Sequence, residues 1–337
     1  MQKNSIPTSW NRNLIYKTIA IASLATGSSF ASAALGCGPI VSVDQGRCSI
    51  TGGSDLTINS GVTVDLSSGS TNYAHAVTIT SDLHPLSTVT NNGTISAAAG
   101  ENPTIYAAGI YANDDVDGAV INEGLIQVSG TATTGTGLMR AIDVRGSVYG
   151  GEITNNGTID VDLIMETDYT AYVNGIHIRR GIYNSGSVTN NGLIDIDVSN
   201  TSDPYEIYGT GILNDGQIYG GGSIVNGGTI DVNITASTRL GKGYGIYQNG
   251  HVFDGEITNN GAISVTVVGD SALGVGISVD GSVYSSGSLI ENEGSITVGV
   301  IGSVEATAFG IEITDGLYNG SQLVNSGVID LTAIGEY

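Results

Sequence analysis

The chain has few charged residues, very few basic ones, and little proline or aromatic character. Charged residues make up 12% of its 337 residues, and only ten are Lys or Arg, against 32 Asp and Glu. Nucleic acid is therefore not an expected partner, because binding to phosphates requires basic patches. After residue 33, no segment has the 18 consecutive apolar residues that are typical of a membrane-spanning helix. Apolar residues still form 40% of the chain and are regularly spaced, which argues against disorder.

The first 33 residues differ in composition from the rest. Their only charges are Lys3, Arg12 and Lys17, and a small-residue apolar run extends over Thr18–Phe30. Ala31-Ser32-Ala33 fits an A-x-A cleavage site, so residues 1–33 are predicted to be a secretory signal peptide; the alternative is a short membrane anchor. Seven basic and 32 acidic residues then remain in the mature chain, a net charge of about −25, which keeps an exported protein soluble.

Cysteine is nearly absent as well. Cys37 and Cys48 are the only two, and both follow the predicted cleavage site. Export permits a disulfide, and we predict one between them. Two free thiols or a metal-binding pair are the alternatives, although two cysteines without a nearby histidine make zinc a poor fit.

Glycine, in contrast, is abundant, and a short phrase of the form aliphatic-x-Asn-x-Gly-x-Ile occurs eight times. Its glycines are Gly93, Gly124, Gly157, Gly192, Gly228, Gly261, Gly294 and Gly327. Its asparagines are Asn91, Asn122, Asn155, Asn190, Asn226, Asn259, Asn292 and Asn325. Successive glycines are 31, 33, 35, 36, 33, 33 and 33 residues apart. A period in this range is typical of a solenoid or another repeat array.

Within one repeat, apolar and polar residues alternate with the period of a half-buried strand. Residues 159–163 show this pattern, with Ile159, Val161 and Leu163 alternating with Asp160 and Asp162. A Gly-Ile pair follows in most repeats, and then a short apolar-aromatic stretch such as 148–149 or 218–219. The sequence therefore predicts an all-β fold, a right-handed parallel β-helix of about eight repeats of ~33 residues. We favour one large coil per repeat with three main sheets over two small coils.

The repeated Asn and Gly are interpreted as structural rather than as a binding site. At the corner of a stacked coil, each amide can bond to the amides above and below and form a ladder. The Gly can supply a positive φ or allow the chain to pass closely.

Candidate chemistry is scarce. Asp160, Asp195 and Asp231 hold one repeat position and would align about 4.8 Å apart, either binding Ca²⁺ or forming a solvated acidic face. Gly269-Asp270-Ser271 has no supporting histidine and is interpreted as a turn. Arg179-Arg180 forms an isolated basic spot, and the four histidines lack metal-ligand spacing: His75, His84, His177 and His251. We expect no catalytic residue, no metal and no cofactor, and hence not an enzyme.

The repeated phrase, the predicted signal and a start such as residues 56–64, LTINSGVTV, resemble the passenger regions of Gram-negative autotransporters over roughly residues 34–337. The resemblance implies a β-helix presented at the cell surface by an outer-membrane β-barrel translocator, which we expect to be missing from this chain. Many such passengers are adhesins or take part in aggregation and biofilm formation, with host or neighbouring-cell surface ligands. The alternative is a secreted carbohydrate-active β-helix enzyme, which would have a groove lined by acids and a base.

Three parts are expected along the chain. Residues 1–33 are the signal peptide, residues 34–88 form an N-terminal cap and the first coils with the disulfide, and residues 89–337 form the repeats. The last repeat ends after one strand, so we expect a truncated or fragmentary gene product.

Overall fold

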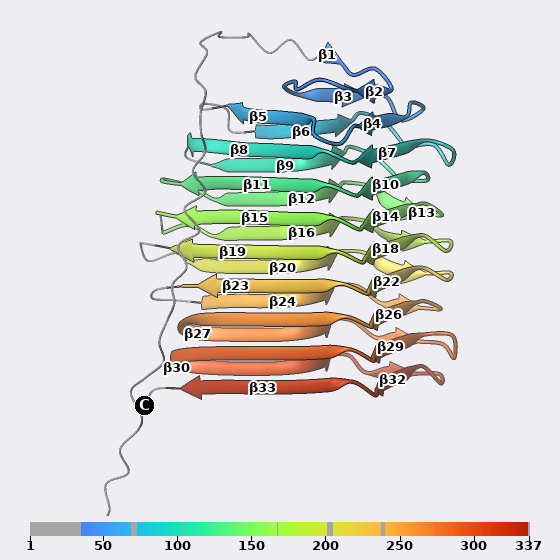
Figure 1. Cartoon of the computed structure of the whole chain (residues 1–337). Helices are drawn as coiled ribbons and strands as arrows, with labels where there is room; N and C mark the ends of the chain where they lie inside the picture. The colour runs from blue at the N-terminus through green and yellow to red at the C-terminus, as the bar shows by residue number, and fades with distance from the viewer. Residues whose placement is uncertain are drawn as a thin grey trace, which may run out of the picture. The chain divides into compact units, whose positions relative to one another are not determined.

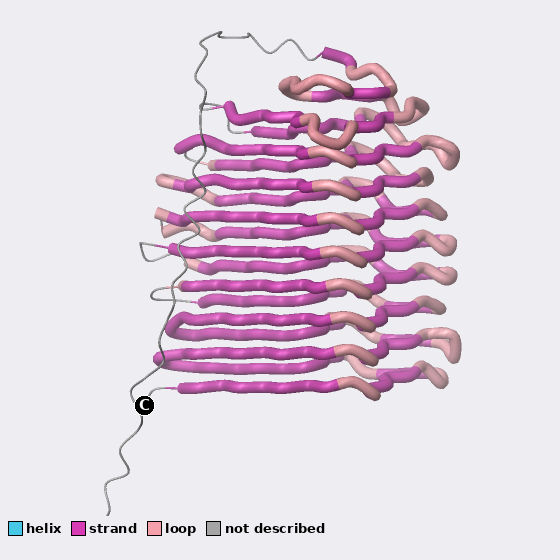
Figure 2. The backbone as a smooth tube through the Cα atoms, viewed as in Figure 1, coloured by secondary structure: helices cyan, strands magenta, loops and turns pink. Residues whose placement is uncertain are grey.

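The computed structural model describes residues 35–68, 73–102, 104–166, 168–200, 205–236 and 240–335. The predicted signal peptide, residues 1–33, lies outside them. Over the described residues the chain contains strands and turns but no helix, and so no helix long and apolar enough to cross a membrane. Strands follow one another from coil to coil as a parallel β-solenoid of about eight turns (Figure 1, Figure 2). The fold class predicted from the repeat is confirmed.

Each coil contributes two long strands to the largest sheet, which has 17 strands. The first of the two strands belongs to what we call the outgoing stack, and the second to the return stack. The outgoing stack contains β5 (Thr63–Ser68), β8 (Thr94–Asn102), β11 (Leu125–Ala132), β15 (Thr158–Met165), β19 (Leu193–Asn200), β23 (Thr229–Thr235) and β33 (Val328–Gly335). The return stack contains β1 (Leu35–Gly36), β3 (Cys48–Ile50), β6 (Tyr73–Ile79), β9 (Ile105–Ala112), β12 (Gly137–Val144), β16 (Ala171–Ile178), β20 (Glu206–Asn214) and β24 (Leu240–Gln248). Two strands, β27 (Ala262–Val279) and β30 (Ser295–Ile313), run through both stacks.

Two smaller sheets complete the coil. The ten-stranded sheet carries the start of the repeated phrase: β2 (Ile40–Val41), β4 (Leu56–Ile58), β7 (Thr88–Asn91), β10 (Ala119–Asn122), β14 (Glu152–Asn155), β18 (Ser187–Asn190), β22 (Ser223–Asn226), β26 (Glu256–Asn259), β29 (Leu289–Asn292) and β32 (Gln322–Asn325). The six-stranded sheet carries the apolar-aromatic stretch: β13 (Ser147–Tyr149), β17 (Gly181–Tyr183), β21 (Gln217–Tyr219), β25 (Val252–Phe253), β28 (Val283–Tyr284) and β31 (Leu317–Tyr318). Each repeat therefore makes one coil, as favoured from the sequence.

The register is set by the repeated isoleucine. Ile126, Ile159, Ile194 and Ile230 pair in successive outgoing strands, and their side chains are fully buried. Their polar neighbours face outward, as the alternation predicted. Since this inner position of the outgoing strands repeats isoleucine, a column of methyl groups runs through the core along the outgoing stack.

The glycine of the Gly-Ile pair lets a return strand lie close to the outgoing strand of the next coil. A Cβ on Gly175 would lie 2.5 Å from Cγ2 of Ile194, and one on Gly211 would lie 2.3 Å from Cγ2 of Ile230. Real Cβ atoms do not approach other atoms this closely, so a larger residue at Gly175 or Gly211 would require the neighbouring isoleucine or backbone to shift. Alanine occupies the equivalent position in two other coils, as Ala76 and Ala141.

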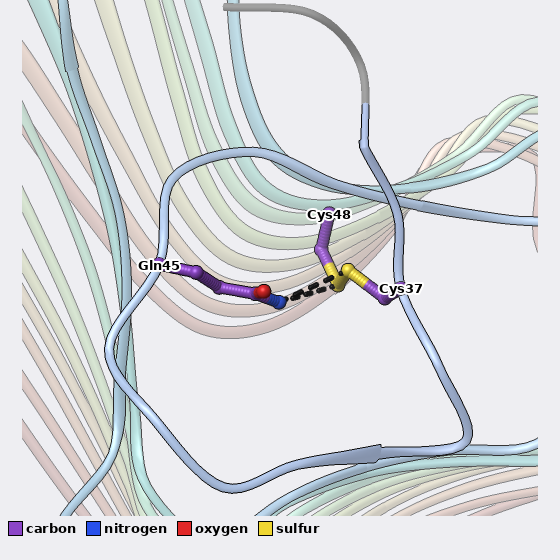
Figure 3. Close-up of a disulfide and its surroundings, with 3 residues drawn as sticks. All are labelled: Cys37, Gln45 and Cys48. Atoms are coloured by element: carbon purple, nitrogen blue, oxygen red, sulfur yellow. Dashed lines mark hydrogen bonds between the residues drawn. A yellow bond between two sulfur atoms is a disulfide. The ribbon is translucent and has the colours of Figure 1, made fainter. Parts of the chain in front are cut away.

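A disulfide closes the first described coil. Cys37 and Cys48 are bonded, with their Cα atoms 5.4 Å apart, and Nε2 of Gln45 lies 3.1 Å and 3.4 Å from the two sulfur atoms (Figure 3). The predicted disulfide is confirmed, and free thiols or a metal pair no longer apply.

Candidate functional site

The repeated asparagines form a ladder inside the corner between the ten-stranded sheet and the outgoing stack. Each side-chain amide donates to the side-chain oxygen of the asparagine in the next coil, at 2.7–2.8 Å, from Asn91 through to Asn325. All of these side chains except Asn325 are fully buried. A buried amide with its donors and acceptors satisfied stabilises the coil and is unavailable to a ligand.

The glycine two residues later is required by close passage of the backbone. A Cβ on Gly192 would lie 1.9 Å from the carbonyl oxygen of Gly157 in the preceding coil. The repeated glycines do not adopt a positive φ, so of the two roles considered from the sequence, close approach is the one that applies.

The outward acids of the outgoing stack align as expected. Asp160, Asp195 and Asp231 are directly paired in consecutive strands, and Gln127 donates to Asp160 at 3.1 Å at one end of the column. Among the described residues, no three His, Cys, Asp or Glu side chains are arranged to hold a metal ion. The calcium interpretation of this column therefore gains no support from the geometry.

The sequence Gly269-Asp270-Ser271 lies in β27, where the pairing with β30 shifts register. It is therefore part of a strand that passes from the outgoing to the return stack, and not a separate turn. Asp270 accepts a hydrogen bond from Ser303 in the next coil. Within the described residues no histidine forms a hydrogen bond with Asp270 or Ser271, so the trio does not resemble a hydrolase triad.

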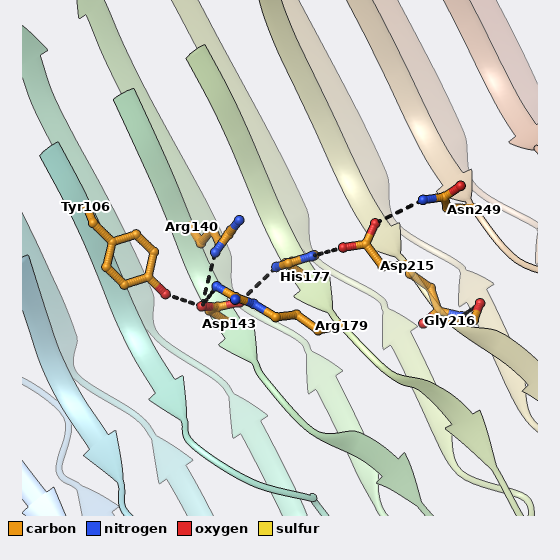
Figure 4. Close-up of polar contacts among 9 residues, drawn as sticks. Tyr106, Arg140, Asp143, His177, Arg179, Asp215, Gly216 and Asn249 are labelled. Atoms are coloured by element: carbon orange, nitrogen blue, oxygen red, sulfur yellow. Dashed lines mark hydrogen bonds and ion pairs between the residues drawn. The ribbon is translucent and has the colours of Figure 1, made fainter. Parts of the chain in front are cut away.

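One histidine, in contrast, takes part in a buried ionic network on the outer side of the return stack (Figure 4). Nδ1 of His177 lies 2.8 Å from Oδ1 of Asp143, and Nε2 lies 2.8 Å from Oδ2 of Asp215. Asp143 is fully buried and His177 is 2% exposed. Each ring nitrogen of His177 thus lies within hydrogen-bond distance of a carboxylate.

Four further side chains complete this network. Asp143 accepts hydrogen bonds from Tyr106, from Arg140 at 3.3 Å and from Arg179 at 3.4 Å. Asn249 donates to Asp215 at 3.4 Å. Apart from Arg140 and Asp143, which are three residues apart, the bonded partners lie 34–38 positions apart in the chain and meet because successive coils stack in register.

The environment shifts the pKa values of these groups. Burial alone would raise the pKa of the Asp143 carboxyl, but the hydrogen bond with His177 and the positive charge of Arg140 outweigh burial, so this pKa lies well below its usual range. The same balance of burial against the His177 hydrogen bond lowers the pKa of Asp215. Burial, followed by the charge of Asp143, raises the pKa of the Tyr106 phenol. Both carboxylates are thus held in the ionised state.

The ionic network lies apart from four surface recesses of the described chain, which are lined by other residues than Asp143 and His177. Through Asp143 the network holds the buried side chain of Arg140 and the partly exposed side chain of Arg179. Breaking a buried pair of this kind costs several kcal/mol, on the order of 3–5.

The basic spot at Arg179-Arg180 is not isolated, which corrects the expectation from the sequence. Arg145 occupies the position equivalent to Arg179 in the preceding coil, as their backbone hydrogen bonds to Ala112 and Val144 show. Nη1 of Arg145 also lies 3.1 Å from the Tyr111 hydroxyl, a hydrogen bond that raises the pKa of the arginine. The sequence contained a signal for this proximity, since Arg145 and Arg179 are separated by 34 residues, which is the length of one coil.

A second feature that the sequence only hinted at is a column of aromatic side chains on the six-stranded sheet, here called the aromatic ladder. It consists of Tyr149, Tyr183, Tyr219, Phe253, Tyr284 and Tyr318 in consecutive coils. The rings of Tyr219 and Phe253 stack at 5.3 Å, and those of Tyr284 and Tyr318 at 5.2 Å. Four members are 41–50% exposed: Tyr149, Tyr219, Phe253 and Tyr318.

A second buried amide pair was also missed. Nδ2 of Asn214 donates to Oε1 of Gln248 at 2.7 Å, at the bend from the return stack to the six-stranded sheet, and both side chains are fully buried. Only two coils carry an amide at this position, so no repeat was visible in the sequence.

One recess, of about 450 Å³, bears on the alternative of a carbohydrate-active enzyme. Asp117 and Glu152 are its two carboxylates, and it contains no basic side chain. Burial and the neighbouring carboxylates of Asp115 and Asp82 raise the pKa of Asp117. The recess has acids but lacks the base that the enzymatic alternative called for.

Comparison of the chain with protein-family models, with curated proteins and with solved structures gave no match.

Proposed function

We propose that this chain is an exported, cell-surface interaction protein, similar to an autotransporter passenger, that adheres through the outer faces of its solenoid. The observation that carries the proposal is the aromatic ladder, which continues over six coils with four of its rings 41–50% exposed. Ring contacts make its second half continuous from Tyr219 to Tyr318, and exposed apolar surface of this kind marks interaction sites.

The distribution of repeated and variable residues supports the same proposal. The corner amides, the corner glycines and the core isoleucines repeat from coil to coil and are buried. Outside the aromatic ladder and the column of Asp160, Asp195 and Asp231, the outward residues differ from coil to coil, and the scaffold presents them on a rigid surface. A rigid scaffold with variable outer residues suits recognition, because little conformational entropy is lost on binding.

Presentation at the surface of a Gram-negative cell follows from the predicted signal peptide, residues 1–33, together with the resemblance of the repeats. Surface ligands of a host cell or of a neighbouring cell are the partners that this proposal implies. The carbohydrate-active enzyme remains the second candidate, but no observation on the described chain favours it over adhesion.

The test is an adhesion assay with the full chain coupled to beads and incubated with epithelial cells or with other coated beads. The variant Tyr149→Ser/Tyr219→Ser removes two exposed members of the aromatic ladder. Its matched control is Tyr169→Ser/Tyr205→Ser, which removes two tyrosines that are 55% and 62% exposed and lie outside the ladder. We expect the wild type and the control to bind or clump, and the ladder variant to lose most of the effect. Failure of the wild-type beads to bind either surface would refute the proposed function.

A further inference from the structure

The few basic residues of this acidic chain are concentrated in two neighbouring coils. Of the seven that follow residue 33, four lie there: Arg140, Arg145, Arg179 and Arg180. Arg145 and Arg180 are exposed, and Arg179 has 35% of its side chain exposed. We call Arg145, Arg179 and Arg180 the arginine patch.

Stacking places these like charges next to one another. The backbone nitrogen of Arg179 donates to Val144, the neighbour of Arg145, at 3.0 Å, and that of Arg180 donates to Gly146 at 3.2 Å. Successive coils are about 4.8 Å apart, a separation at which like charges destabilise the stack unless they are compensated.

Compensation within the chain is incomplete. Asp143 forms ion pairs with both Arg140 and Arg179, so one carboxylate serves two guanidinium groups. Among the described residues, Arg145 forms a hydrogen bond with the Tyr111 hydroxyl and not with a carboxylate. Within the described part of the chain, neither Arg145 nor Arg180 has an ion-pair partner. An external anion would supply the missing charge and accept hydrogen bonds from the guanidinium groups.

The arginine patch borders the aromatic ladder. The Tyr183 hydroxyl donates to the carbonyl oxygen of Arg180 at 2.9 Å, which holds this ring beside the arginine. Tyr149 and Tyr219 flank Tyr183 in the coils before and after. A ligand seated on the arginines thus has aromatic surface directly next to its anionic group.

The charge of the whole chain restricts the ligand further. The chain has 32 acidic residues against ten basic ones. A long polyanion would therefore extend beyond the arginine patch and be repelled by the surrounding carboxylates. The favoured ligand therefore carries its negative charge at one end and continues as neutral groups. The apolar faces of neutral sugar rings pack well on aromatic side chains, and a carboxylated or sulfated sugar residue supplies the charged end.

We infer that the arginine patch and the first half of the aromatic ladder form a binding site for an acidic saccharide. Its carboxylate or sulfate would lie on Arg145 and Arg180, and neutral sugar residues would lie along Tyr149, Tyr183 and Tyr219. The inference deepens the proposed function by naming a ligand class, and it rests on that function only for its biological setting.

The experiment is titration calorimetry of the full chain with sialyllactose and with sulfated lactose, and with lactose and inorganic sulfate as reference ligands. The variant Arg145→Gln/Arg180→Gln removes two charges of the arginine patch. The control Arg47→Gln/Lys242→Gln removes two charges elsewhere on the described chain. We expect both acidic sugars to bind, lactose to bind at least tenfold more weakly, and the patch variant to lose about tenfold in affinity, since charge-assisted hydrogen bonds are the strong ones. The control variant is expected to bind within twofold of the wild type.

Several results would overturn the inference. Absence of binding by both acidic sugars would do so, as would equal losses in the two double variants. Equal affinity for inorganic sulfate would reduce the site to a simple anion site without a saccharide. If the patch variant lost self-association in sedimentation velocity while wild type bound no sugar, the partner would be an acidic face of a second copy. Cell adhesion that survived in the patch variant would refute the saccharide site and leave the proposed function intact.

Discussion

Replacement of a central rung of the asparagine ladder by a residue of similar volume should destabilise the solenoid strongly. In Asn190→Leu, Asn155 loses the acceptor that its amide contacts at 2.7 Å, and Asn226 loses the donor that its oxygen contacts at 2.8 Å. Asn190 also loses its own bond to the carbonyl oxygen of Thr229 at 3.1 Å. Each buried polar group left unsatisfied costs about 1–3 kcal/mol, so a loss of about 3–5 kcal/mol is expected.

For a chain of about 300 folded residues, unfolding entropy of about 2 cal/mol/K per residue converts this loss into a decrease in Tm of about 5–8 °C. The measurement is thermal unfolding followed by circular dichroism, together with urea unfolding at 25 °C. The matched control is Asn191→Leu, which makes the same change one residue later, where the side chain is exposed and bonds only to Asn156 at 2.9 Å. Asn325→Leu, at the exposed end of the ladder, should cost less than Asn190→Leu. Equal melting curves for Asn190→Leu and Asn191→Leu would show that the ladder does not stabilise the fold.

Four other predictions concern separate parts of the chain. Burial, and then the charge of Arg47, lower the pKa of His75 to about 4, so its contribution to stability is complete above about pH 6.5 and is lost as the pH falls to 4. The free energy of unfolding should decrease by about 3 kcal/mol over this pH range. In urea unfolding at a series of pH values, His75→Gln should lose less of this free energy than the wild type. Parallel pH dependences of the two proteins would contradict the prediction. Gly192→Ala should lower Tm because its Cβ would meet a carbonyl oxygen at 1.9 Å, whereas Gly299→Ala, with open space around it, should change Tm little. Reduction of the disulfide should speed hydrogen exchange mainly in residues 35–58, since solenoid coils stabilise only their neighbours; uniform acceleration along the chain would count against this. Mass spectrometry of the exported protein should find a chain beginning at Ala34, and an intact N-terminus would refute cleavage.

The fold could be predicted from the sequence because its determinants are local and repeated. The alternation around Ile159 and the glycine at position 192 each satisfy a requirement that recurs in every coil, so the repetition itself reveals it. The same holds for Asn190, whose partners are the same residue type one coil away.

The candidate site could not be predicted in this way, because it is made of residues that occur once. Asp143, His177 and Asp215 meet through the register of three coils whose lengths differ, and no repeat marks them. Arg145 and Arg179 are neighbours for the same reason. Adding the coil length to each residue number would have found both groups, provided that the position of each insertion were known.

Stacking in register makes the outer surface of this solenoid a regular lattice of residues, ordered by coil in one direction and by position within the coil in the other. Residues at the same position of neighbouring coils are in contact, although they lie more than 30 residues apart in the chain. Duplication or deletion of one whole coil would shift every residue beyond it by one coil without changing the core. The distance between the arginine patch and a given ring of the aromatic ladder could therefore change in steps of about 4.8 Å through recombination between repeats, without a single substitution.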